Sequence, residues 1–213
     1  MALLLELFQQ DLPIGEEVVL DILIPAATWS VGKPNSKIRH ASVLCLSQLS
    51  ERGLIKASFL AEIFKDLLFP PLKSCLDDDW DSPLRFASIV LMRKLLSYLE
   101  GCFGPDALEL REIYPELLKR MDDSQDNIRE KACEALAAFC AMLPEDWSES
   151  LFVYIVKSVI IHLDDPSEAI QKAVRDLLLG MARINKSKLV AMDAFVSISL
   201  KQRIDSAPQP DRG

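Results

Sequence analysis

Residues 111–139 decide the fold, and they read REIYPELLKRMDDSQDNIREKACEALAAF. The stretch predicts a first helix over about 111–121, a polar turn over 122–126, and a second helix that carries Arg129 in its opening turn. Apolar residues of the second helix recur three and four positions apart, which is helical and not strand periodicity. A hairpin of this kind cannot bury its apolar stripe alone, so the stretch predicts similar neighbours.

Three further units carry the same pattern at nearly constant spacing. Aligned on Arg129, the four units read Ile38-Arg39-His40-Ala41, Leu84-Arg85-Phe86-Ala87, Ile128-Arg129-Glu130-Lys131 and Ile170-Gln171-Lys172-Ala173. The anchors lie 46, 44 and 42 residues apart. Self-similarity at such a period is typical of helix pairs stacked in a row. The sequence therefore predicts an all-α, right-handed α-solenoid of about four helical hairpins, whose function lies on a surface and not in a pocket.

We expect one solenoid domain over residues 1–205. Its expected parts are repeats at about 16–53, 57–101, 108–143 and 150–185, a capping helix at about 187–204, and a disordered tail at 206–213. The final helix is expected to cover the last apolar face of the stack, because a terminal repeat needs a polar outer side. The start of the chain offers less cover, which suggests that a longer array precedes it in the natural protein.

The charge pattern argues against nucleic acid and membranes as partners. The chain has 24 Lys and Arg against 32 Asp and Glu, a net charge of −8, and its basic residues are interleaved with acids. Phosphate binding needs clustered Lys and Arg. No window approaches the roughly 18 apolar residues that span a bilayer. Five cysteines without a C-x-x-C pair, and no secretory signal, indicate reduced thiols in the cytosol or nucleus, and we expect a cytoplasmic location.

No catalytic residue, cofactor site or metal site is assigned from the sequence. His40 and His162 are the only histidines and belong to different units, with nothing beside them that completes a catalytic set. The acidic run Asp77-Asp78-Asp79-Trp80-Asp81 could attract a hard cation, but it lacks the glycine and closing glutamate of an EF-hand loop. A solvated turn is the favoured interpretation. An enzyme with a metal site at this run is the alternative class of function.

The three tryptophans receive different predictions. Trp29 is expected to pack inside. Trp80 and Trp147 are flanked by acids and are candidate exposed anchors at a protein interface, with packing under a local loop as the alternative.

The units also share prolines and aspartates at fixed distances from the anchor. Three units carry a proline fourteen residues before the anchor, at Pro25, Pro71 and Pro115. Three carry an aspartate six residues before it, at Asp79, Asp123 and Asp165. This pattern resembles the HEAT-repeat family over roughly residues 18–185. The resemblance implies that turn aspartates pair with arginines of neighbouring repeats as a ladder. The implied pairs are Asp79 with Arg39, Asp123 with Arg85, and Asp165 with Arg129.

Within that family, the phrase over residues 112–124 resembles the repeats of HEAT proteins that assemble axonemal dyneins. The resemblance implies a cytoplasmic, non-catalytic interaction scaffold for preassembly of the dynein arms of motile cilia, with dynein chains, other assembly factors or chaperones as partners. The alternative is a scaffold or adaptor of another pathway, of the transport-receptor or phosphatase-scaffold type. In either case we expect the second helices to present side chains such as Lys94, Glu130, Glu134 and Arg175 to the partner.

Overall fold

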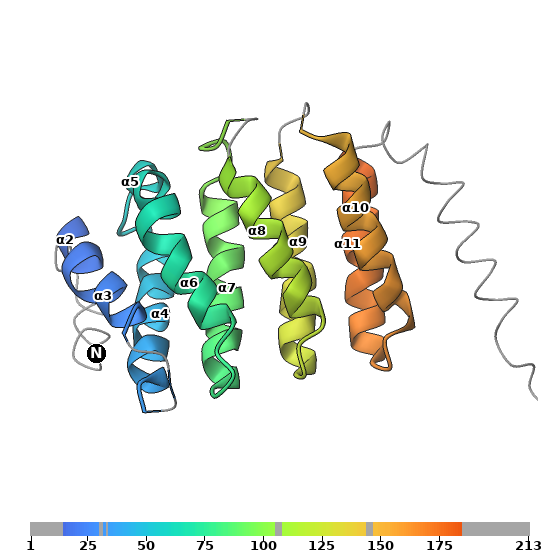
Figure 1. The fold of residues 1–213 in the computed structure, drawn as a ribbon. Coiled ribbons are helices and arrows are strands. Elements are labelled where there is room, and N and C mark those ends of the chain that lie inside the picture. Colours follow the sequence, from blue (N-terminus) through green and yellow to red (C-terminus); the bar gives the residue numbers. More distant parts are fainter. Residues whose placement is uncertain (1–14, 30–31, 33, 105–107, 144–146, 185–213) are drawn as a thin grey trace, which may run out of the picture.

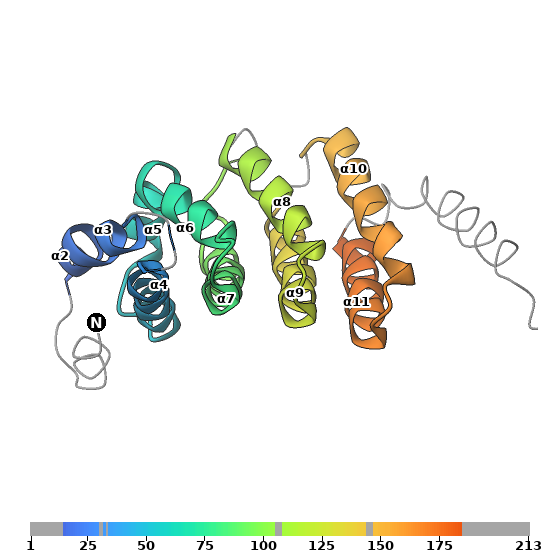
Figure 2. The same cartoon turned by 60° about the horizontal axis from the view of Figure 1, so that its bottom comes forward.

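The computed structural model describes residues 15–29, 32, 34–104, 108–143 and 147–184, and every regular element within them is helical. The helices lie in two layers, with the first helix of each hairpin in one and the second helix in the other (Figure 1, Figure 2). The predicted all-α solenoid is confirmed. The expected capping helix over 187–204 and the tail over 206–213 lie outside the described residues.

The second layer consists of four long helices, which we call the second-helix row. They are α4 (Ser36–Glu51), α7 (Ser82–Tyr98), α9 (Asp126–Met142) and α11 (Glu168–Ile184). Contacts run from α4 to α7, from α7 to α9 and from α9 to α11, so the row follows chain order. A stack of this kind gains its stability from nearest-neighbour interfaces.

The first layer is less regular. Its members are α2 (Glu16–Val18), α3 (Ile24–Ala27), α5 (Ala57–Ile63), α6 (Phe69–Leu76), α8 (Leu108–Met121) and α10 (Glu149–Ile160). A π-helical turn joins α2 to α3 over Val19–Leu23, another joins α5 to α6 over Phe64–Leu68, and a 3-10 turn extends α10 over Ile161–Asp164. No helix in the described part of the chain is long and apolar enough to cross a membrane.

Prolines explain the two π-helical turns. The amide of Ile24, just before Pro25, donates to the carbonyl five residues back at Val19, and Phe69, just before Pro70, donates in the same way to Phe64. Proline has no amide proton and collides with the preceding turn, so a wider turn there accommodates the ring. Pro115 lies inside α8, whose bounds contain no such turn. The first helices therefore bend locally and still pack on the second layer.

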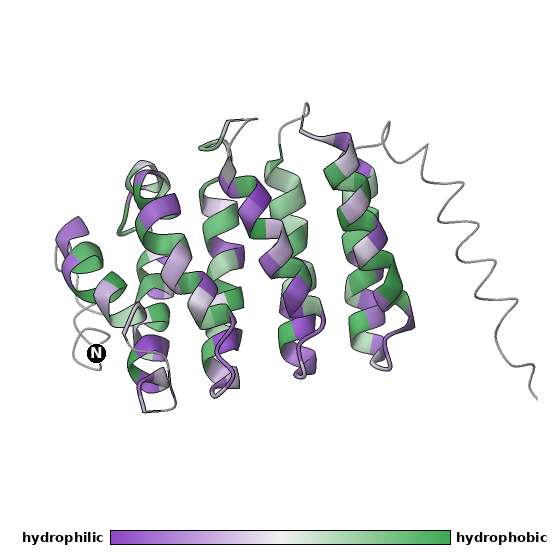
Figure 3. Cartoon of the chain, viewed as in Figure 1, coloured by the Kyte–Doolittle hydropathy of each residue, from purple (hydrophilic) through white to green (hydrophobic). Residues whose placement is uncertain are grey.

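Polar turns and glycine turns lie at opposite ends of the hairpins. The Asp81 carboxylate accepts from the Leu84 amide at 3.0 Å and caps the start of α7. Gly53, with φ of 63°, ends α4, and the next amide, Leu54, donates back to Leu49 at 3.0 Å as in a Schellman motif. Figure 3 shows hydrophilic residues gathered at the end where the hairpin turns lie.

Leucines and aromatic rings fill the space between the layers. Leu46, Leu95, Leu136 and Val174 from the four second helices are all buried. In the third and fourth hairpins Trp147 meets Phe139 and Tyr114 edge to face, with ring centroids 6.0 and 6.3 Å apart. Ile38 is an exception among the aligned anchor positions, since it is exposed. We attribute its exposure to the absence of a preceding second helix in the described residues.

Candidate functional site

The central pair of the ladder joins the second and third hairpins. Arg85, in the first turn of α7, donates from Nε to Asp123 Oδ2 at 2.8 Å and from Nη2 to Asp123 Oδ1 at 3.0 Å. Both side chains are buried. Such a two-point arginine–carboxylate contact fixes geometry as well as charge, and it therefore sets the orientation of one hairpin on the next.

The partner of Arg39 is Asp78, and the prediction of Asp79 was wrong by one residue. Arg39 Nη1 lies 2.7 Å from Asp78 Oδ2, and both side chains are almost completely buried. The turn between α6 and α7 has five residues, whereas the turn between α8 and α9 has four. The rule of six residues before the anchor arginine therefore selects Asp79 in this turn instead of Asp78. Asp78 and Asp123 each lie two residues after the end of their own first helix.

Arg129 and Asp165 form a third, more open pair. Arg129 Nη2 donates to Asp165 Oδ1 at 3.2 Å, while Nε lies 3.1 Å from Oδ2 without hydrogen-bond alignment. Arg129 also lies 3.1 Å from Asp126, whose side chain is exposed. Because this pair shares its arginine with a solvated carboxylate, it constrains the stack less than the two buried pairs.

Each ladder aspartate joins two repeats. The carboxylate holds the arginine of the previous hairpin, and the backbone carbonyl accepts a side-chain donor from the second helix of its own hairpin. These carbonyl contacts are Arg85 to Asp78 at 2.9 Å, Arg129 to Asp123 at 3.0 Å, and Gln171 to Asp165 at 2.8 Å. Gln171, which departs from the arginine pattern, thus keeps the contact within its own repeat.

Electrostatics favour the ionised form of the central pair. Burial acts to raise the pKa of Asp123, but hydrogen bonds from Arg85 and the Gln125 amide, with the charges of Arg85 and Arg120, outweigh it and hold the pKa below its usual value. The hydrogen bond to Asp123 raises the pKa of Arg85. Asp77 adds contacts to Lys119 at 2.7 Å and Arg120 at 2.9 Å. Within the acidic run, Asp77 and Asp78 thus pair with cations of the two neighbouring hairpins, while Asp81 caps α7 and Asp79 is exposed.

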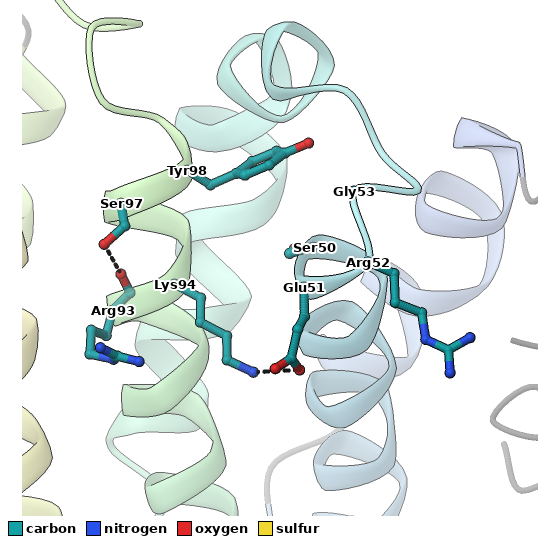
Figure 4. Close-up of a pocket in the computed structure, with 8 residues that line it drawn as sticks. All are labelled: Ser50, Glu51, Arg52, Gly53, Arg93, Lys94, Ser97 and Tyr98. Carbon is teal, nitrogen blue, oxygen red and sulfur yellow. Dashed lines mark hydrogen bonds and ion pairs between the residues drawn. The ribbon is translucent and has the colours of Figure 1, made fainter. Parts of the chain in front are cut away.

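A hollow of about 680 Å³ opens between the glycine ends of α4 and α7, and we call it the α4–α7 hollow. It is lined by Ser50, Glu51, Arg52, Gly53, Arg93, Lys94, Ser97 and Tyr98. In Figure 4, Lys94 and Glu51 point toward each other across it, with Arg93 on the α7 side and Arg52 on the α4 side. Lys94 Nζ lies 3.0 Å from Glu51 Oε2 and donates to Ser47 Oγ at 3.0 Å. Tyr98 donates to the Ile55 carbonyl at 2.6 Å and closes one wall.

Other side chains expected to face a partner are spread along the row. Glu130 and Glu134 line a smaller hollow of about 260 Å³ between α9 and α11. Glu134 Oε2 lies 3.5 Å from Arg93 Nε, which links α7 to α9. Arg175 is exposed on α11. Lys94 and Glu134 thus also join neighbouring helices, a role that the sequence analysis did not assign to them.

The predictions of a packed Trp29 and of an exposed anchor at Trp147 were wrong. Trp147 is 5% exposed and packs against Phe139 and Tyr114, as the alternative of local packing has it. Trp29 is exposed, because it lies beyond α3, whose buried Ile24 and Ala27 fill the inward positions. Trp80 is 64% exposed on the turn between α6 and α7, as an anchor would be.

Burial keeps three of the described thiols protonated. Burial raises the pKa of Cys133 and of Cys140 to about 12, and that of Cys45 to about 11. Such thiols are poor nucleophiles because little thiolate forms near neutral pH. Among the described residues, no group of three or more His, Cys, Asp or Glu is placed to hold a metal ion.

Comparison with known proteins connects this geometry to a family. A model of the HEAT-like repeat matches residues 92–139, which include parts of α7, α8 and α9. The sequence is similar to dynein axonemal assembly factor 5 from three species. Identity is 29% over 83% of this chain for Xenopus laevis, 30% over 76% for Homo sapiens, and 29% over 76% for Mus musculus. The chain spans about a fifth of the length of these relatives, 21%, 19% and 19% respectively.

Solved structures resemble the fold at low sequence identity. An engineered protein superposes with a TM-score of 0.61 at 15% identity, covering 89% of this chain and 73% of its own. A designed armadillo repeat protein, solved with the peptide (KR)4, superposes with a TM-score of 0.50 at 13% identity, covering 76% of this chain and 68% of its own. The chain is thus an α-solenoid, its residues 92–139 match the HEAT-like repeat, and its sequence is similar to dynein axonemal assembly factor 5.

Proposed function

We propose that this HEAT-repeat solenoid is a non-catalytic, cytoplasmic scaffold that binds protein partners during preassembly of axonemal dynein arms. The observation that carries the proposal is the similarity to dynein axonemal assembly factor 5 over 76–83% of the chain. The expected partners are dynein chains, other assembly factors or chaperones.

The second-helix row supports a role in protein binding. Each hairpin adds one helix to the row (Figure 2), and charged side chains of both signs, among them Lys94, Glu130, Glu134 and Arg175, lie along it. A broad, charged face selects partners by electrostatic complementarity and gains affinity from many modest contacts. Four carboxylates near the turns, Asp77, Asp78, Asp123 and Asp165, hold arginines or lysines of neighbouring hairpins, which suits a structural role.

Affinity capture from ciliated cells tests the proposal. The tagged chain is expected to recover dynein heavy or intermediate chains from cytoplasmic extract. Because Arg39 is buried in the ladder, Arg39→Ala should lower recovery together with thermal stability. Arg111→Gln, an exposed change on the first-layer helix α8, should leave stability and recovery unaltered and serves as the folded control.

Three results would contradict the proposal. Recovery of transport cargo or phosphatase subunits without dynein chains would favour the scaffold of another pathway. Recovery of no partner at all by a folded chain would remove the scaffold role. Stoichiometric metal retained through dialysis would favour the enzyme alternative at the acidic run.

A further inference from the structure

We propose that the α4–α7 hollow binds a segment of a partner protein that carries Asp or Glu side chains. This proposal rests on the proposed scaffold function and names the chemistry of one contact. The hollow is lined by three cationic residues, Arg52, Arg93 and Lys94, and by one carboxylate, Glu51, and the Arg52 side chain points away from α7 (Figure 4). Arg93 and Lys94 on α7 are thus two adjacent cations on a chain whose net charge is −8.

Lys94 is held in place in a way that leaves room for an exchange of carboxylates. Its Nζ contacts both Glu51 Oε2 and Ser47 Oγ at 3.0 Å. The Lys94 side chain is 24% exposed, whereas the Glu51 side chain is 63% exposed. A partner carboxylate can therefore displace that of Glu51 into water, while Ser47 keeps the ammonium group in position.

Arg93 supplies a second point of attachment on the same helix. Its side chain is 43% exposed, and its Nε lies 3.5 Å from Glu134 Oε2, which is longer than a normal hydrogen bond. A guanidinium group has five N–H donors in a planar fork, so Arg93 can donate hydrogen bonds to a further carboxylate without losing a strong contact. Arg93 and Lys94 together fit a segment with two neighbouring acidic side chains.

Stabilisation of the helix ends does not account for these cations. Favourable interaction with the helix dipole is limited to the last turn, and Arg93 and Lys94 both lie more than one turn before Tyr98, where α7 ends. Arg52 does cap α4 and is explained in part by that position. Arg93 and Lys94 on α7 are therefore the two cations that specifically indicate a binding site.

The shape of the hollow and the short distance over which charges act in salt favour a short acidic segment over a long polyanion. The hollow is an open volume of about 680 Å³ between two adjacent helices, which is large enough for several side chains of an extended segment. Charges are screened beyond roughly 8 Å at physiological salt, so a short segment senses mainly the local cations. A nucleic acid would extend over the rest of an acidic surface and be repelled there.

Binding of a labelled peptide of alternating Glu and Ser to the full chain tests the proposal by fluorescence anisotropy. Removing two charge contacts should weaken binding of this peptide to Arg93→Gln/Lys94→Gln by about tenfold. Glu51→Gln should strengthen binding by roughly twofold to fivefold, because the internal competitor is lost. The matched controls are Arg111→Gln/Lys157→Gln and Glu112→Gln, at exposed positions of the first-layer helices α8 and α10, which make the same changes in net charge and should alter binding less than about twofold.

A zero-length carbodiimide crosslink between the peptide and the protein gives the site directly, and it is expected at Lys94. The proposal is overturned by crosslinks only at other lysines, by equal weakening in the first-layer control, or by tighter binding of a Lys-Ser peptide. Circular dichroism melting of each variant excludes unfolding as the cause.

The two proposals can fail separately. If the acidic peptide does not bind while dynein chains are captured, the hollow has no such role and the scaffold function remains. If the peptide binds at Lys94 while no dynein chain is captured, the proposed pathway is wrong and the acidic-segment site remains.

Discussion

Arg39 is among the largest completely buried side chains in the described residues, and a buried arginine is tolerated only when its charge and donors are matched. Its guanidinium contacts the Asp78 carboxylate, the Ala27 carbonyl and the Ser74 hydroxyl at 2.7, 3.3 and 2.9 Å. Replacing a whole buried ion pair is often neutral, but removing one partner leaves an uncompensated charge and costs several kcal/mol. Arg39 and Asp78 therefore act as a single unit.

The choice of Asp78 over Asp79 can be tested by comparing two adjacent substitutions. Asp78→Ala strands Arg39 and removes the acceptor of the Trp80 and Asp81 amides, so we expect it to lower the free energy of unfolding by about 3 kcal/mol or more. Asp79→Ala changes an exposed side chain and should stay within about 0.5 kcal/mol. Urea denaturation measures both. Equal losses, or a larger loss for Asp79→Ala, would contradict the ion pair seen here.

The lengths of the hairpin turns explain which arginine–aspartate pairs could be predicted from the sequence. The hairpins and the central pair Arg85–Asp123 follow from periodicity and from the spacing of arginines and acids. The partner of Arg39 does not, because one extra residue in the α6–α7 turn shifts the spacing without altering the composition. The sequence also could not decide that Trp147 packs against Tyr114 and Phe139 while Trp29 is exposed, since both flank helix ends.

Glycine has opposite effects at two positions in the second-helix row. Gly53 ends α4 with φ of 63°, a conformation that side chains with a Cβ rarely adopt, and Gly180 lies within α11. An added Cβ would meet no heavy atom within 4 Å at either place. We therefore expect Gly53→Ala to destabilise by about 1 kcal/mol through the backbone alone, and Gly180→Ala to stabilise by about 0.5–1 kcal/mol.

Thermal melts of the two variants measure this contrast, with each serving as the control for the other. If both substitutions change the melting temperature in the same direction, the left-handed turn at Gly53 does not limit stability.

At the scale of the whole molecule, stability comes from interfaces between neighbours, and the central helices have neighbours on both sides. Contacts link α7 to both α4 and α9, and α9 to both α7 and α11. We expect backbone amides of α7 and α9 to exchange with deuterium more slowly than those of α4 and α11, because local opening is easier at the ends of a stack. Mass spectrometry of peptic fragments measures this gradient. Uniform protection across the four helices would instead indicate a single cooperative unit.

The three arginine–aspartate pairs all lie along the hairpin-turn edge of the stack, on the side opposite to the α4–α7 hollow. Flexing that opens the turn edge must separate buried ion pairs, whereas flexing that opens the opposite edge separates the partly exposed pair of Lys94 and Glu51. Because water and salt screen an exposed pair more than a buried one, we expect the stack to widen more readily at the hollow than at the turns, and to do so further as salt is added.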